Sequence, residues 1–222
     1  MSTPEASGPT VRTATAKDVP FVAQLDYWAS HEPFGRSFWD GLLTGTGTAT
    51  LPFLEAVFAS NASRWGGVED FILVEGDHGP MAGCAVFAPS DSPDAWHPLD
   101  LAKLKRVADR LEWSRGAQQA FEAAYRKVWG GDLAFLEPQA ERIVEAVAVA
   151  PNHRGKGLGH VLMRAAKTRA KAQGAASLGV MVIHGNEAAA SLYAKHFQPY
   201  VTFHEDYFDG AFPGVTKYRA SL

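Results

Sequence analysis

The stretch between residues 147 and 163 constrains the fold most, because an apolar strand runs into a helix through three closely spaced glycines. Its sequence is Val147-Ala-Val-Ala-Pro-Asn-His-Arg-Gly-Lys-Gly-Leu-Gly159, and a helical pattern follows. Glycine lets the backbone approach a ligand closely, and the first amides of a helix have no partner within the helix. Aligned peptide dipoles add about half a positive charge there. The stretch therefore predicts a phosphate-binding site between a strand and a helix.

The charge distribution favours a compact anionic ligand for this segment. No Asp or Glu lies between Glu145 and Glu187, an interval that holds six basic residues: Arg154, Lys156, Arg164, Lys167, Arg169 and Lys171. The whole chain has 21 basic and 24 acidic residues, so the remainder carries a net charge of −9. Nucleic-acid-binding domains usually spread basic residues over a broad face, so we expect no nucleic-acid partner.

Length and composition are those of a globular protein. The 222 residues are 46% apolar and 20% charged, and no apolar run approaches the roughly 18 residues of a membrane helix, so we expect no membrane partner. The first ten residues do not resemble a signal peptide, and Cys84 is the single cysteine, in an apolar strand where a packed thiol is favoured over a nucleophile. We therefore expect a cytoplasmic protein with a flexible tail at 1–9 and a single domain at 10–222.

The order of apolar patterns predicts an α/β sheet with at least one parallel crossover. A helical insertion at about 90–140 is expected within the domain, and 34–50 is expected to be an irregular connection. Strands are predicted at 10–14, 71–75, 82–88, 142–149, 178–183, 201–208 and 214–220, and helices at 15–30, 51–60, 99–111, 117–128, 157–173 and 187–196.

Three phosphate-binding patterns compete for the glycine-rich stretch. A P-loop would need a glycine where Asn152 stands and a Lys-Ser/Thr after Gly157, so it is excluded. The dinucleotide fingerprint would need a glycine where His160 stands and an acidic residue about 20 positions later, so a nucleotide-dependent oxidoreductase is disfavoured. The third pattern, Arg/Gln-x-x-Gly-x-Gly/Ala, matches Arg154, Gly157 and Gly159.

With this pattern the chain resembles the GNAT superfamily of N-acetyltransferases. Two later segments extend the resemblance, Asn186-Glu-Ala-Ala189 and Leu192-Tyr-Ala-Lys-His-Phe197. The resemblance implies a mixed, mostly antiparallel twisted sheet flanked by helices, with a parallel pair splayed around an acyl-CoA site. The family usually has Gly-Phe where this chain has His196-Phe197, so the helix must end differently or His196 must adopt a left-handed conformation.

The resemblance also implies acetyl-CoA, or a related acyl-CoA, as co-substrate. The glycine-rich loop would hold its pyrophosphate, the end of the preceding strand its pantetheine arm, and Asn186 would contact that arm, with a plain N-cap as the alternative role. Tyr193 would protonate the departing thiolate, with a packed aromatic as the alternative. The candidate cofactor contacts are Val147, Val149, Arg154, Gly155, Lys156, Gly157, Gly159, His160 and Asn186.

Acetyl transfer to an amine requires a base, because an amine with a pKa near 10 is mostly protonated at neutral pH. Glu145 lies two residues before Val147, and strand alternation predicts both side chains on one face. Glu145 is therefore the candidate base, with a salt-bridged residue as the alternative, and amides near Val149 would polarise the thioester carbonyl. No metal-ligand motif occurs, so no metal site is expected.

These observations predict an acetyl-CoA-dependent N-acetyltransferase in which a primary amine of a small molecule attacks the thioester directly. The alternative is a non-catalytic acyl-CoA-binding sensor or regulatory module, which would not need Tyr193 or Glu145. A homodimer is left open.

Overall fold

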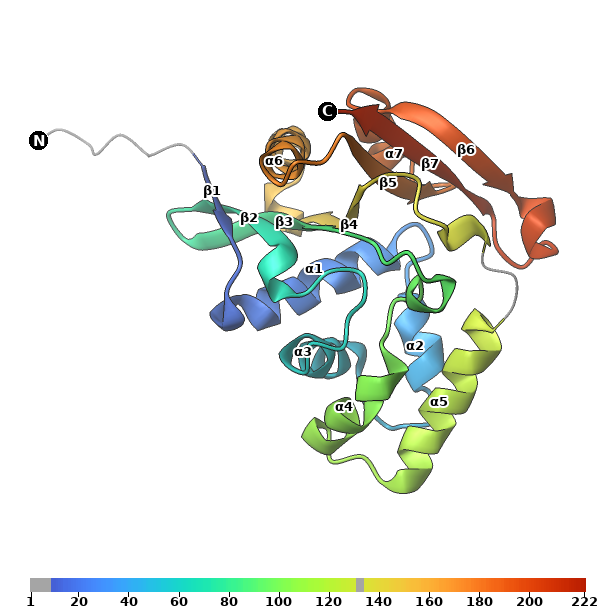
Figure 1. The fold of residues 1–222 in the computed structure, drawn as a ribbon. Coiled ribbons are helices and arrows are strands. Elements are labelled where there is room, and N and C mark those ends of the chain that lie inside the picture. Colours follow the sequence, from blue (N-terminus) through green and yellow to red (C-terminus); the bar gives the residue numbers. More distant parts are fainter. Residues whose placement is uncertain (1–8, 131–133) are drawn as a thin grey trace, which may run out of the picture.

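The computed structural model describes residues 9–130 and 134–222, which contain a seven-stranded sheet in the order β1-β2-β3-β4-β5-β7-β6 (Figure 1). β4 and β5 pair in parallel, and the other neighbours are antiparallel. The predicted mixed, mostly antiparallel sheet is therefore confirmed. The strands are β1 (Thr10–Thr13), β2 (Phe71–Gly76), β3 (Gly79–Phe87), β4 (Arg142–Val149), β5 (Ser177–Ile183), β6 (Gln198–His204) and β7 (Gly214–Ser221).

Helices cover both faces of the sheet. In Figure 1, α6 lies on one side of the β1–β4 half, and α1 lies on the other side with α2, α3, α4 and α5 beyond it. The helices are α1 (Val19–His31), α2 (Phe38–Leu43), α3 (Thr50–Ala59), α4 (Leu104–Arg110), α5 (Arg115–Trp129), α6 (Leu158–Ala172) and α7 (Glu187–Ala194).

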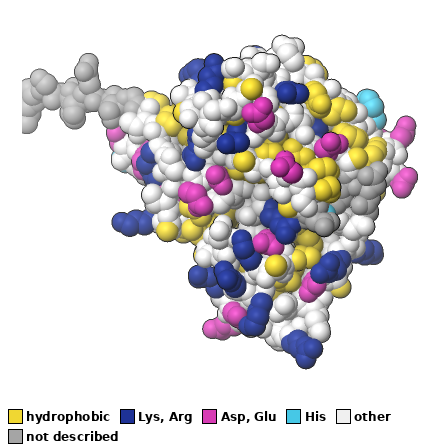
Figure 2. Space-filling model, in the orientation of Figure 1, with side chains coloured by type: hydrophobic (Ala, Val, Ile, Leu, Met, Phe, Trp, Pro, Cys, Tyr) yellow, Lys and Arg dark blue, Asp and Glu magenta, His cyan; other side chains and the backbone are white. Residues whose placement is uncertain are grey.

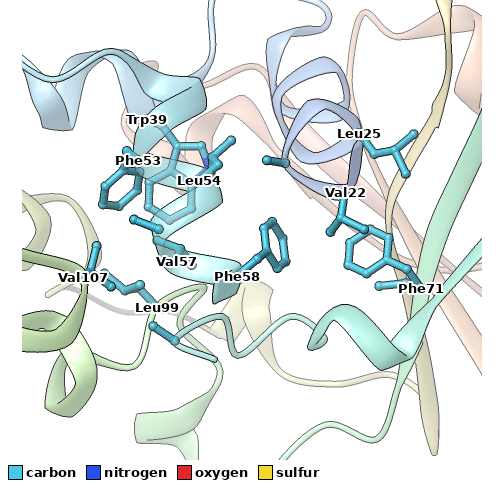
Figure 3. Packing of buried hydrophobic residues seen from close by; sticks show 14 of the residues in the cluster. Val22, Leu25, Trp39, Phe53, Leu54, Val57, Phe58, Phe71, Leu99 and Val107 are labelled. Atoms are coloured by element: carbon cyan, nitrogen blue, oxygen red, sulfur yellow. The ribbon is translucent and has the colours of Figure 1, made fainter. Parts of the chain in front are cut away.

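The largest buried cluster lies between the sheet and α1. Val22 of α1 and Phe58 of α3 pack toward Phe71 of β2, and Leu99 and Val107 from the 90–140 segment belong to the same cluster (Figure 3). Complete burial of each such side chain contributes about 1.5–3 kcal/mol. The helical segment between β3 and β4 therefore shares its core with α1 and the sheet.

A second cluster lies under α6. Leu162 and Met163 of α6 pack with Cys84 of β3 and Val180 of β5, and all four are essentially inaccessible to solvent. Cys84 is thus a packed thiol. Burial raises its pKa to about 12, so at neutral pH the group is not a thiolate.

The sheet opens beyond the start of the parallel pair. β4 pairs with β5 over Arg142–Val144 alone, whereas it stays paired with β3 as far as Val149. A bulge lies at this point, since Ala146 has a φ of 52° and the β3–β4 register shifts between Gly83 and Ala85. The two parallel strands therefore separate, as predicted. The backbone groups of β4 beyond Val144 do not pair with β5 and face the space between the two strands.

The bulge overturns the predicted placement of Glu145 and Val147 on one face. Ile143 and Ala148 belong to the cluster beside α1, whereas Val144 and Val147 belong to the cluster under α6. Strict alternation would separate Val144 and Val147, because they are three residues apart. The extra residue at Ala146 inverts the alternation, so Glu145 and Val147 point to opposite faces.

The predicted irregular connection at 34–50 was wrong in its middle, where α2 forms. Ser37 caps this helix, since its hydroxyl accepts from the Trp39 amide at 3.2 Å and Asp40 accepts from the Ser37 amide at 2.9 Å. This reciprocal pair is a capping box, and Leu42 and Leu43 are buried beyond it. A six-residue helix is too short to show a clear apolar period.

The remaining boundaries differ by a few residues. The helix predicted at 187–196 ends at Ala194, and His196 has no left-handed conformation. The strand predicted at 201–208 begins at Gln198 and gives way to a short 3-10 helix at Glu205–Phe208. Residues 1–8 of the predicted tail and 131–133 of the predicted insertion lie outside the described residues, and the division into tail and domain stays a prediction.

Candidate active site

A pocket of about 790 Å³ opens where β4 and β5 separate. One wall consists of Glu145, Ala146 and Val147 of β4 with Met181, Val182 and Ile183 of β5, and Asn186 and Ala189 of α7 continue it. Asp26 and Ala29 of α1, a helix that packs against β4, also line the pocket. The structure thus brings three predicted site residues, Glu145, Val147 and Asn186, to one pocket.

Aromatic rings from distant segments enclose the rest of the pocket. Phe135, Phe208 and Phe212 form a chain with ring centroids 5.1 Å apart at each step, and Phe34 continues it at 5.7 Å. A second group joins Trp129 to Phe38 at 5.7 Å and to Trp65 at 6.1 Å. All seven rings line the pocket, and no motif in the sequence marks any of them as a site residue.

The charged side chains that line the pocket, among the described residues, are all carboxylates: Asp26, Glu32, Glu145 and Asp209. Asp26 is partly buried, and its Oδ1 accepts a hydrogen bond from Trp39 Nε1 at 3.1 Å. Burial raises its pKa to about 6, although the Trp39 bond acts in the opposite direction. Sequence patterns did not single out Asp26, because it sits in an ordinary amphipathic helix.

The pKa of Glu145 is raised further than that of Asp26. Burial, followed by the nearby charge of Asp26, raises its pKa to about 8, and Lys217 opposes the shift. Lys217 is itself buried, donates to the backbone carbonyl of Glu137, and has a pKa lowered by burial to about 8. A carboxyl group with a pKa near the working pH is suited to accept and release a proton.

The glycine-rich loop forms a turn with free amides at the start of α6. Gly155 and Gly157 have φ values of 74° and 78°, which favour glycine, and a Cβ at either position would meet nothing within 4 Å. Among the described residues, no acceptor is found for the amides of residues 155–159. Unpaired amide donors with open space beside them, at the start of a helix, fit an anion such as a pyrophosphate.

The two basic side chains of the loop remain exposed beside it. Arg154 Nε donates to the Val149 carbonyl at 3.2 Å, and its Nη1 lies 3.9 Å from Glu32 Oε1 at the pocket. Lys156 Nζ donates to the Asn152 carbonyl at 3.0 Å. Neither lines the pocket, so both are placed for a group bound at the loop rather than inside the pocket.

The third glycine has a packing role. A Cβ on Gly159 would lie 2.9 Å from Leu192 Cδ2, so glycine allows α6 and α7 to approach closely. Asn186 begins α7, and its Oδ1 accepts from the Ala189 amide at 3.1 Å. Because Asn186 also lines the pocket, its amide nitrogen is available there, so both predicted roles fit one side chain.

Tyr193 and His160 do not line the pocket in the described part of the chain. Tyr193 is buried against Tyr218 and Phe197, and burial, with the charge of Glu145, raises its pKa well above the usual range. His160 Nδ1 lies 2.8 Å from His196 Nε2, so that ring nitrogen is already engaged. Val149, another predicted cofactor contact, packs under α6.

The fold and the site together have the architecture of an acyltransferase, in which a splayed parallel strand pair meets a glycine-rich loop with unpaired amides. The acetyltransferase (GNAT) family matches residues 55–197 of the chain. The chain belongs to this family.

Individual relatives are more distant. Streptothricin acetyltransferase of Streptomyces lavendulae is 44% identical over 52 residues, which are 23% of this chain and 28% of that protein, so the match spans little more than a quarter of the relative. The structure of SsHAT aligns over 97% of this chain and 98% of its own with a TM-score of 0.62 and 16% identity. YncA from Salmonella typhimurium, solved with its cofactor acetyl-CoA, aligns over 97% and 95% with a TM-score of 0.54 and 14% identity. These two structures share the fold.

Proposed function

We propose that this chain is an acetyl-CoA-dependent N-acetyltransferase that acetylates a primary amine of a small molecule. The observation that carries the proposal is the junction of the glycine-rich loop with the gap between β4 and β5, where unpaired amides lie next to a pocket containing a proton-accepting carboxylate. Family membership supports acyl transfer in general.

The residues fit acetyl-CoA. The amides of residues 155–159 would bind the pyrophosphate, with Arg154 and Lys156 adding charge at the loop surface. Val147, Val149 and the free edge of β4 would bind the pantetheine arm, and Asn186 would contact it from α7. Acetyl-CoA supplies the activated acetyl group as a thioester.

Glu145 would act as the base. An acceptor amine reaches the site mostly as an ammonium ion, and the Glu145 carboxylate can take its proton directly or through water. Tyr193, which stays protonated because of its raised pKa, would donate a proton to the leaving sulfur. Direct attack by the amine needs no protein nucleophile, in keeping with the buried, protonated Cys84.

The pocket favours a small acceptor over a macromolecule. Its volume of about 790 Å³ lies in the range of about 300–1,000 Å³ that small-molecule sites occupy. On the face shown in Figure 2, basic and acidic side chains are interspersed, as over α4 and α5, which is unlike the broad basic face of a nucleic-acid-binding protein. Among the described residues, no helix is both long and apolar enough to cross a membrane.

The first test is calorimetric titration of the protein with acetyl-CoA, with NADH and ATP as controls. We expect binding of acetyl-CoA alone, followed by release of free thiol when amines are added. Binding without thiol release from a broad amine panel would instead support an acyl-CoA sensor. Absence of acetyl-CoA binding would refute the proposal.

A further inference from the structure

Asp26 is a carboxylate at the pocket wall that the proposed chemistry does not use. It comes from α1, which packs against β4, and the described residues give its Oδ2 no hydrogen-bond partner. The Trp39 indole holds Oδ1, so the side chain has a fixed orientation. A buried carboxylate without a cationic partner is unfavourable, so a positive charge on a bound ligand would stabilise it.

Asp26 and Glu145 differ in the charged and polar groups that act on them. No Lys, Arg or His is among the described residues that line this pocket, so a bound molecule would meet only carboxylates. Lys217 acts on Glu145, whereas Trp39 is the one group that favours the charged form of Asp26. Two carboxyl groups whose pKa values differ in this way usually take different roles, and the more acidic one remains ionised.

The aromatic walls suit the same ligand. Phe38, Trp65 and Trp129 form one group and Phe34, Phe208 and Phe212 another, each with successive centroids within about 6 Å. Aromatic faces attract ammonium and guanidinium groups, most strongly where water is excluded, and also pack against aliphatic chains. The pocket thus combines negative charge with an apolar enclosure.

We propose that Asp26 binds a second cationic group of the acceptor, so that the preferred substrates are amines carrying a further positive charge on an apolar body. This inference rests on the proposed acetyltransferase function. Asp26 is then a specificity-determining residue, and Glu145 remains the base for the amine that is acetylated.

The test compares Asp26→Asn with the wild-type protein on cadaverine and pentylamine, which differ by one terminal amine. Asparagine retains an oxygen that can accept the Trp39 hydrogen bond, so the pocket geometry should persist. We expect the wild type to prefer cadaverine by about tenfold or more in kcat/KM, and Asp26→Asn to lose that preference mainly through KM. Because Asp26 also raises the pKa of Glu145, both proteins are assayed at about pH 9, where Glu145 is ionised in each and the rate with pentylamine should change by less than about threefold.

Asp209→Asn is the matched control. Asp209 is an exposed pocket residue with a φ of 52°, a conformation that asparagine also tolerates, so the substitution removes one negative charge without strain. It should leave the cadaverine preference nearly unchanged. Both variants should unfold at or above the wild-type temperature, because Asp26→Asn removes an unfavourable buried charge, and both should bind acetyl-CoA with wild-type affinity, which shows that the fold and loop are intact.

The outcomes separate the two proposals. Equal use of both amines by the wild type, or an equal fall of kcat on both amines in Asp26→Asn, would overturn the role of Asp26 while leaving the acetyltransferase intact. Failure to bind acetyl-CoA would instead refute the proposed function. If neither amine is acetylated, calorimetry of cadaverine with the CoA-loaded protein decides, because binding that Asp26→Asn weakens supports the inference and absence of binding overturns it.

Discussion

His160 Nδ1 and His196 Nε2 lie 2.8 Å apart and link the first turn of α6 to the segment that follows α7. One of the two nitrogens must donate and the other accept, which requires at least one ring to be neutral at this contact. Lys167 Nζ also donates to the His196 carbonyl, at 2.5 Å. The histidine pair therefore connects the end of α7 to α6, the helix that begins at the glycine-rich loop.

This contact predicts a loss of stability in acid. Burial, then the charge of His160, lowers the pKa of His196 below its usual 6.5. The stabilisation is present above the unfolded-state pKa and is lost as pH falls through the folded-state pKa. Thermal unfolding should show a larger loss between about pH 7 and pH 5 for the wild type than for His196→Gln. His78→Gln, in the exposed β2–β3 turn, should follow the wild type, and identical curves for all three proteins would contradict the prediction.

Alanine substitutions at two glycines should distinguish an effect on stability from an effect on cofactor affinity. Gly157 and Gly174 have φ values of 78° and 77°, and a Cβ at either would meet nothing within 4 Å. Alanine at each position should cost about 1 kcal/mol in unfolding free energy from backbone strain. Only Gly157→Ala should weaken acetyl-CoA binding in calorimetry, because its methyl group would stand in the loop. Equal affinities for the two variants would place the pyrophosphate elsewhere.

Glu145→Gln is expected to abolish most turnover and to stabilise the protein in base. With a pKa raised from 4.5 to about 8, Glu145 favours the folded state when protonated, and this contribution is lost as pH rises through about 8. The wild-type rate should rise with pH to a plateau above about pH 8, because the carboxylate is then available. The rate of the variant should not rise with pH in this way, and its kcat should be lower by about a hundredfold or more.

Unfolding measurements check the second half of that prediction. The variant should be more stable than the wild type at about pH 8, with a smaller difference at about pH 5. If Glu145→Gln lowers the rate by the same factor at every pH and keeps the shape of the wild-type profile, another group is the base.

Tyr193→Phe should lower turnover by about a hundredfold and leave acetyl-CoA affinity unchanged, because the hydroxyl would act on the leaving sulfur alone. Tyr218→Phe is the control, since that ring is also buried and its centroid lies 6.2 Å from Tyr193. Free-thiol assays and calorimetry measure the two effects. If both variants keep full turnover, Tyr193 has only a packing role. That result would agree with its position away from the pocket wall.

Local chemistry in the sequence determined the phosphate-binding loop and the elements that flank it. The strand at 142–149 has the predicted bounds, and α6 begins one residue after the predicted position, because its apolar pattern and the positive φ of Gly157 are local properties. Gly174 follows the end of α6 for the same reason. The resemblance to acetyltransferases rested on these segments, and the family match includes them.

Tertiary structure alone decided how the pocket is built. Nothing in the sequence around Ala146 indicates a bulge, because alanine adopts a positive φ only where neighbouring strands impose it, and that bulge separates the directions of Glu145 and Val147. Asp26 lies at the pocket because α1 packs against β4, which is more than a hundred residues later in the chain. Burial and the proximity of charges, which set the properties of Asp26 and Glu145, arise from such long-range contacts and leave no local pattern.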